Sequence, residues 1–188
     1  MEPSLEGITL AELALRVGDG LSLAGILGDT PVIVFNPTRE GGPSPLYHTP
    51  TGDQEQPRMP LSASQTSTFD RDEMSNQVEA LRTAVVVPIT PSNRNLHEDR
   101  ITVGRDPSCD IRLTSKLVSK LHIQFRKNAA EQWVIEDEGS SNGTLLNGLK
   151  IEKNEPYRIH SSDQIVLSDV GAVFLDAEGL VELCRLFQ

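Results

Sequence analysis

The chain has 188 residues, of which 37% are hydrophobic, and it carries a formal net charge of -10 at pH 7. This length and composition fit one domain of ordinary size with appendages. Nucleic-acid binding requires Lys and Arg side chains that displace counterions from phosphates, so the acidic balance argues against DNA or RNA as a partner.

The chain contains two cysteines, Cys109 and Cys184. The sequence does not exclude a disulfide between them, but two thiols so far apart in the chain are more simply free thiols of a reducing compartment. No apolar run approaches the roughly 18 residues of a membrane helix, and the N-terminus lacks the basic segment of a signal peptide. We therefore expect a cytoplasmic protein that does not bind a membrane.

Residues 1–37 predict a small N-terminal extension with a helix and a strand. Apolar residues follow helical spacing at Leu10, Leu13, Ala14 and Val17. Thr9, with Glu12 three residues later, forms a capping-box pattern before this helix, and the run PVIVF at 31–35 is typical of a strand. These elements are too small for a core of their own. We expect them to pack on the main domain or on a partner, as structural support or as a docking element.

Residues 38–82 are poor in apolar side chains and rich in Pro, Ser, Thr, Gln and acids. Such a composition cannot bury enough apolar area to offset chain entropy, so we predict a disordered linker. Thr66 and Thr68 are either phosphorylation sites whose products would bind this chain's own or a neighbour's domain, or ordinary linker composition.

Residues 83–188 predict about ten short strands and a C-terminal helix. The apolar or alternating runs are 84–89, 101–103, 111–113, 122–125, 133–135, 145–146, 149–151, 157–159, 164–167 and 171–175. Turn signals separate them, and Asn147-Gly148 is typical of a hairpin turn. Many short strands at such spacing indicate an all-β sandwich. Apolar residues within 177–187 follow helical spacing, which predicts a helix whose apolar face packs on the sandwich or binds a partner.

Polar residues suited to holding a phosphate stand at the ends of these strands. They are Arg105, Ser119, Lys120, Ser141 and Asn142. A phosphate needs a cation and several hydrogen-bond donors, and Arg105 can offer a planar, bidentate fork. Gly104 before it lets the loop turn tightly. Loops on a stiff sheet lose little entropy on binding, which suits a recognition site.

Three blocks of sequence follow one another through these loops. They are 104–105 (GR), 119–122 (SKLH) and 137–144 (DEGSSNGT), with 147–148 (NG) after the third. Together they resemble the signature of the forkhead-associated (FHA) domain, a phosphothreonine-peptide binder. The resemblance covers about half of the chain and implies an all-β fold, an FHA-like β-sandwich of about ten to eleven strands.

The resemblance also implies roles for single residues. Arg105 and Ser119 contact the phosphate, Ser141 adds a hydroxyl, and Asn142 hydrogen-bonds the peptide backbone. Lys120 is either a second cation for the phosphate or a surface lysine. Structural support of the site is implied for Gly104, His122, Gly143 and Thr144.

The roles of two further groups of residues in these loops remain undecided between alternatives. By the resemblance, the loop with Lys116 and Leu117 selects the residue three positions after the phosphothreonine, and both apolar and acidic residues remain candidates. Glu136, Asp137 and Glu138 either pair with the basic loops or are solvated.

No enzyme pattern accompanies these residues. The four histidines lack the spacing of a metal site, and the chain has no CxxC, P-loop or GxSxG motif. We therefore expect a non-enzymatic module without cofactor or metal, which recognises phosphothreonine on partner proteins as an adaptor downstream of a Ser/Thr kinase. The alternative is a phosphate-independent structural or assembly module of a larger complex such as secretion machinery. The joint presence of Arg105, Ser119 and Asn142 argues against it.

Overall fold

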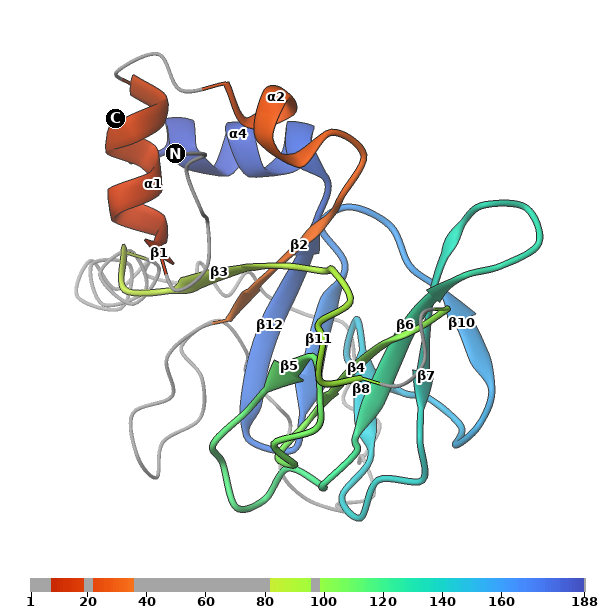
Figure 1. Cartoon of the computed structure of the whole chain (residues 1–188). Helices are drawn as coiled ribbons and strands as arrows, with labels where there is room; N and C mark the ends of the chain where they lie inside the picture. The colour runs from red at the N-terminus through yellow and green to blue at the C-terminus, as the bar shows by residue number, and fades with distance from the viewer. Residues whose placement is uncertain (1–7, 19–21, 36–81, 96–98, 188) are drawn as a thin grey trace, which may run out of the picture.

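The structure, a computed structural model, describes residues 8–18, 22–35, 82–95 and 99–187. In this part of the chain, twelve strands form two sheets that pack face to face, with three helices at one end (Figure 1). Almost all of the predicted linker, including Thr66 and Thr68, lies outside the described residues. The fold confirms the all-β prediction, and ten of the strands come from residues 83–188, as the sequence indicated.

The larger sheet has seven strands, in the order β1 (Ile8–Thr9), β3 (Val85–Pro88), β2 (Val32–Phe35), β12 (Val170–Leu175), β11 (Gln164–Leu167), β8 (Thr144–Leu146) and β9 (Leu149–Lys150). The smaller sheet has five, in the order β10 (Pro156–Arg158), β7 (Trp133–Asp137), β6 (Ile123–Lys127), β4 (Ile101–Gly104) and β5 (Ile111–Arg112). Neighbouring strands are antiparallel except for the parallel pair β4 and β5. The β8–β9 hairpin turns at Asn147 and Gly148, which both have positive φ, as predicted.

Strand β2 lies inside the larger sheet, where it pairs with β12 on one side and with β3 on the other. All four of its residues are buried. Because side chains alternate along a strand, Ile33 and Phe35 enter the core between the two sheets, while Val32 and Val34 face the helices. The N-terminal segment therefore packs on the main domain and supplies one of its inner strands.

The three helices cover the outer face of the larger sheet near one end. They are α1 (Leu10–Gly18), α2 (Leu23–Leu27) and α4 (Ala177–Arg185). The predicted capping box is present, because Thr9 N–H donates to Glu12 Oε2 over 3.1 Å and Glu12 N–H donates to Thr9 Oγ1 over 3.3 Å. Leu180 and Cys184 of α4 are fully buried among residues of α1, α2 and the sheet, so this apolar stripe is core.

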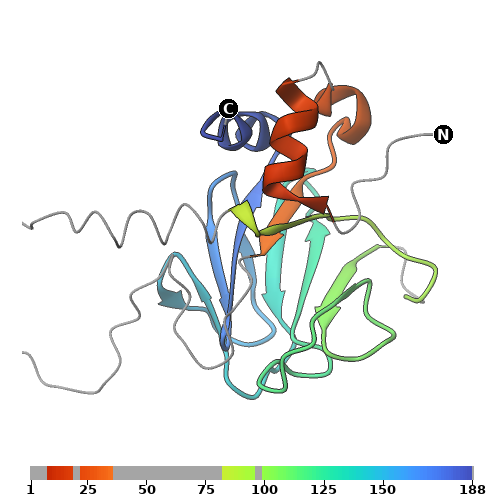
Figure 2. The same cartoon turned by 90° about the vertical axis from the view of Figure 1, so that its left-hand side faces the viewer.

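The loops that leave β4, β5 and β7 lie at the end of the sandwich opposite to the helices, and Figure 2 shows the same arrangement from the side. The turn between β11 and β12 joins them there, because Ser168 Oγ donates to the carbonyl of Leu117 over 2.9 Å. Cys109 and Cys184 are both free thiols. Within the described residues, no helix has the length and apolar character needed to cross a bilayer.

Candidate functional site

Three loops meet at this end of the sandwich: residues 105–110, 113–122 and 138–143. Backbone hydrogen bonds join the first two, from Arg105 N–H to the carbonyl of Ser119 and from Asp106 N–H to the carbonyl of Lys120, each over 2.9 Å. Glu138 N–H donates to the carbonyl of His122 over 2.9 Å and attaches the third loop. The predicted site residues are thus carried by loops that are bonded to one another.

The side chains of Ser119, Ser141, Asn142 and Arg105 are held at this junction. Ser141 N–H donates to Ser119 Oγ over 2.9 Å, and the two hydroxyl oxygens are 3.5 Å apart. Asn142 Nδ2 donates to the carbonyl of Leu117 over 2.9 Å. Arg105 Nε donates to the carbonyl of Val118 over 3.2 Å, and among the described residues nothing occupies its terminal nitrogens. One exposed guanidinium and several hydroxyl and amide groups therefore lie together, where an anion can reach them.

Lys120 follows Ser119 directly and is exposed. Its carbonyl accepts from Asp106 N–H over 2.9 Å and from Cys109 Sγ over 3.3 Å. The backbone at Lys120 is therefore firmly placed, while its ammonium remains free to move toward an anion on the neighbouring Ser119.

Gly104 lies where the first two loops approach each other most closely. A Cβ atom at this position would lie 2.2 Å from the carbonyl oxygen of Lys120, far inside the contact distance of two atoms. Only glycine lets β4 end beside the backbone of Lys120, so Gly104 permits the pairing that brings Arg105 next to Ser119.

The ring of His122 contacts backbone groups of both the second and the third loop. This fully buried ring accepts from Ser119 N–H at Nδ1 over 3.1 Å, and Nε2 lies 3.3 Å from the carbonyl oxygen of Gly143. An imidazole that accepts at Nδ1 and donates at Nε2 is neutral. Burial lowers the pKa of His122 below its ordinary value of 6.5, and the bond to Gly143 and the charge of Asp137 offset this only in part.

The third loop is organised around the carboxylate of Asp137, at the end of β7. This fully buried group accepts from Ser140 N–H, Ser140 Oγ and Thr144 Oγ1, each over 2.7 Å. Ser140 Oγ in turn accepts from Gly143 N–H over 2.9 Å. Burial alone would raise the pKa of Asp137, but the bonds from Thr144 and Ser140 hold it below its ordinary value. The carboxylate stays charged and closes the loop that carries Ser141 and Asn142.

A family model described as the FHA domain matches residues 101–168, the stretch that contains all three loops. These residues form an FHA domain. The FHA fold is a phosphopeptide-binding module, which agrees with an anion-accepting junction of loops on a rigid sandwich.

Known proteins resemble the chain over this domain. The E3 ubiquitin-protein ligase RNF8 of Bos taurus is 37% identical over 73 residues, which are 37% of this chain and 15% of that protein. The oxoglutarate dehydrogenase inhibitor of Corynebacterium jeikeium is 35% identical over 81 residues, 43% of this chain and 54% of that protein. The chain thus spans between about a sixth and about a half of the length of these relatives. Among solved structures, the MEK1 FHA domain in complex with a HOP1 phosphothreonine peptide matches with a TM-score of 0.40 and 28% identity, over 48% of this chain and 87% of that chain.

Two residues that build the site of the FHA domain, Asp137 and Ser140, were not predicted from the sequence as part of it. Both readings of Asp137, as a partner of the basic loops or as a solvated acid, are wrong, because the group is buried on hydroxyl and amide donors. The signal was present in the sequence: an acid three positions before a serine, followed by Gly and Thr, is a pattern in which side chains bond nearby backbone groups.

Two further residues lie beside the site without having been predicted. The side chain of Lys150 covers Gly143, since a Cβ there would meet Lys150 Cε at 2.7 Å. Asp169 accepts from Ser115 Oγ over 2.7 Å and anchors the loop that carries Leu117. Sequence alone could not place them, because Lys150 comes from β9 and Asp169 from the turn between β11 and β12. In the described residues, no group of His, Cys, Asp and Glu is arranged to hold a metal ion.

The buried His122 makes the stability of the FHA domain depend on pH. Because its pKa is lower in the folded protein than in the unfolded chain, the unfolded chain binds the proton more readily. Above the pKa of the unfolded chain, about 6.5, His122 is neutral in both states and costs no stability. As pH falls below this value, the free energy of unfolding decreases, by at most about 1.4 kcal/mol per pH unit. Urea unfolding between pH 7.5 and 5 measures this slope.

Two variants separate His122 from other titrating groups. His122→Gln should flatten the slope below pH 6.5, whereas His160→Gln, which alters an exposed histidine near Asp163, should keep it. An unchanged slope in His122→Gln would refute the assignment.

Proposed function

We propose that this chain binds phosphothreonine-containing peptides of partner proteins at the junction of its three loops. The observation that carries this proposal is the cluster of Arg105, Ser119, Ser141 and Asn142, which hydrogen bonds between loops hold together on one exposed surface. The FHA domain supports it, because its family consists of phosphopeptide-binding modules.

Each residue of the cluster has a role that its geometry allows. The terminal nitrogens of Arg105 can form the bidentate pair that a phosphate prefers. Ser119 and Ser141 supply hydroxyl groups at the same junction. The amide of Asn142, oriented by its bond to the carbonyl of Leu117, can bond the peptide backbone. Lys120 adds a mobile positive charge.

The proposal includes a role as a cytoplasmic adaptor that acts downstream of a Ser/Thr kinase and needs no cofactor. A binding site with a threonine methyl pocket would also favour phosphothreonine over phosphoserine, as the FHA resemblance implies. The rival function is a phosphate-independent assembly module, which would use the same sandwich but leave the exposed guanidinium of Arg105 without a role.

Fluorescence anisotropy with one peptide in three forms tests the proposal: phosphothreonine, threonine and phosphoserine. Because the phosphate supplies most of the charge-assisted hydrogen bonds, we expect the threonine form to bind at least about 100-fold more weakly than the phosphothreonine form. A peptide library with phosphothreonine at its centre provides the starting sequence. Equal binding of phosphorylated and unphosphorylated members would favour the assembly module.

A further inference from the structure

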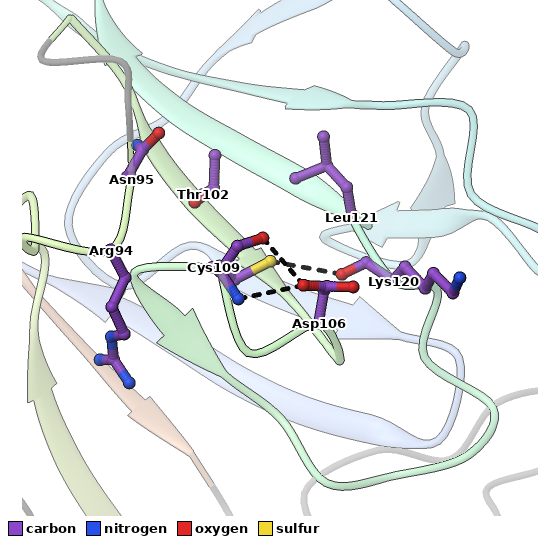
Figure 3. Close-up of a pocket in the computed structure, with 8 residues that line it drawn as sticks. Arg94, Asn95, Thr102, Asp106, Cys109, Lys120 and Leu121 are labelled. Atoms are coloured by element: carbon purple, nitrogen blue, oxygen red, sulfur yellow. Dashed lines mark hydrogen bonds between the residues drawn. The ribbon is translucent and has the colours of Figure 1, made fainter.

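A pocket of about 390 Å³ opens beside the 105–110 loop (Figure 3). One wall of the pocket comes from the two loops that carry Arg105 and Ser119. The first loop contributes Asp106 and Cys109, and the second contributes Lys120 and Leu121. The segment before β4 forms the opposite wall. The volume lies in the range of roughly 300–1,000 Å³ that small ligand sites occupy.

The pocket begins one residue beyond the proposed phosphate site. Arg105 is bonded to Ser119, and the next pair along the same two loops, Asp106 and Lys120, is bonded in the same way and already lines the pocket. A peptide that places its phosphate on Arg105 and Ser119 therefore has a neighbouring side chain within reach of the pocket. Leu117 precedes Ser119 in the chain and does not line the pocket, and its carbonyl accepts from Asn142 and Ser168.

The polar groups of the pocket already have partners inside the protein. Thr102 Oγ1 donates to Asp110 Oδ2 over 2.8 Å and accepts from Asp110 N–H over 3.1 Å. Asn95 Nδ2 donates to Asp110 Oδ2 and to the carbonyl of Arg100, over 2.7 and 2.8 Å. Asp106 Oδ1 accepts from Ser108. A polar ligand group would lose its water here without gaining an equivalent bond, which is costly.

The two positive charges at the rim do not turn the pocket into an anion site. Figure 3 shows the charged ends of Arg94 and Lys120 directed away from the centre, to different sides. Arg94 Nη2 donates to the carbonyl of Asp110 over 3.1 Å, and the carboxylate of Asp106 stands near Lys120. Arg94 is therefore bonded inside the protein, and an acidic side chain in the pocket would meet the carboxylate of Asp106.

What the pocket does offer is apolar surface. Leu121 is 38% exposed and lines the pocket. Cys109 lies at the centre with its thiol hydrogen directed to the carbonyl of Lys120. Burial raises the pKa of the Cys109 thiol, so it remains neutral and acts as a small apolar group.

We propose that this pocket is a specificity site for an aliphatic side chain, such as leucine, isoleucine or methionine, that precedes the phosphothreonine in the bound peptide. The proposal rests on the proposed function and deepens it, since it names a second feature of the ligand. The residues before the phosphothreonine are assigned to the pocket because the FHA resemblance assigns the residues after it to the loop with Leu117, which does not line the pocket. Covering the exposed face of Leu121 removes apolar surface from water, which favours binding.

Phosphothreonine peptides with alanine at all flanking positions test the proposal on the full chain. Leu, Glu and Lys are introduced singly at each of the four positions before and the four positions after the phosphothreonine, and affinities are measured by fluorescence anisotropy. We expect leucine at one preceding position to bind about 3- to 10-fold more tightly than alanine, as burial of part of an aliphatic side chain predicts. Glu and Lys at that position should bind no better than alanine.

Two matched leucine variants locate the effect. Leu121→Ser should bring the ratio of the two affinities, leucine peptide over alanine peptide, close to 1. Leu149→Ser, which alters a 75% exposed leucine on the β8–β9 hairpin, should leave this ratio unchanged. Amide NMR shifts of Thr102, Cys109 and Leu121 that differ between the two peptides on the wild-type chain give a second readout, independent of any variant.

Three results would overturn the proposal while phosphate-dependent binding persists. They are no preference for leucine before the phosphothreonine, a preference for glutamate there, and a leucine preference that Leu121→Ser does not reduce. Absence of all phosphate-dependent binding would overturn the proposed function together with this inference, so the two failures are distinguishable.

Discussion

Replacing Asp137 with alanine should lower the free energy of unfolding by about 3–5 kcal/mol, the largest effect that we expect from a polar residue of this domain. The carboxylate is fully buried and accepts three hydrogen bonds, each over 2.7 Å, from Ser140 and Thr144. Without it, three donors remain buried with no acceptor. Chemical denaturation monitored by the fluorescence of Trp133 measures the loss.

Two comparisons show whether the hydrogen bonds cause this loss. Asp137→Asn keeps a side chain of similar shape with one acceptor oxygen, so it should lower the free energy of unfolding less than Asp137→Ala does. Glu152→Ala removes the same negative charge from an exposed position and should change the free energy of unfolding by less than about 0.5 kcal/mol. If Asp137→Ala were as mild as Glu152→Ala, the network around Asp137 would not organise the third loop.

The strands were predictable because their signals are local. Alternating or β-branched runs separated by turn residues mark β3 to β12, and Asn147-Gly148 marks a hairpin whatever surrounds it. The helix α1 was predictable for the same reason, since its capping box joins residues three apart. Each of these elements is specified within about ten residues of sequence.

The place of β2 was not predictable in this way. Its run of apolar residues indicates a strand, but only the sheet shows that the strand lies between β3 and β12 and is buried on both faces. Phe35 pairs with Val85 on one side and with Ala172 on the other, and both partners are far from it in the chain. Pairing between distant segments leaves no mark in a local pattern, so the role of the N-terminal segment was left open.

The candidate site shows the same division between local and distant information. Arg105, Ser119, Ser141 and Asn142 stand in blocks with a recognisable order, and the structure brings them to one junction. The pocket beside them has no such signature, because its walls come from three segments and its character depends on which polar groups are already bonded. Chemistry of this kind becomes visible only when hydrogen bonds can be assigned.

Arg105→Ala should weaken the binding of a phosphothreonine peptide about 10- to 150-fold, which corresponds to a loss of about 1.5–3 kcal/mol. The guanidinium is exposed, and within the part of the chain that the structure describes its side chain makes one hydrogen bond, from Nε to the carbonyl of Val118. The terminal nitrogens are therefore left for the ligand. The backbone bond from Arg105 N–H to Ser119 survives the substitution. Stability should therefore change by less than about 0.5 kcal/mol, and isothermal titration with denaturation of the same samples measures both quantities.

Graded variants distinguish a phosphate contact from a general effect of charge. Arg105→Lys keeps the charge but loses the planar fork, so its affinity should fall between those of the wild type and Arg105→Ala. Arg158→Ala removes an exposed arginine from β10, at the opposite edge of the five-stranded sheet from β5, and should change affinity less than about twofold. An equal loss in Arg105→Ala and Arg158→Ala would mean that the ligand responds to overall charge. Equal losses for the phosphorylated and unphosphorylated peptides would mean that Arg105 does not contact the phosphate.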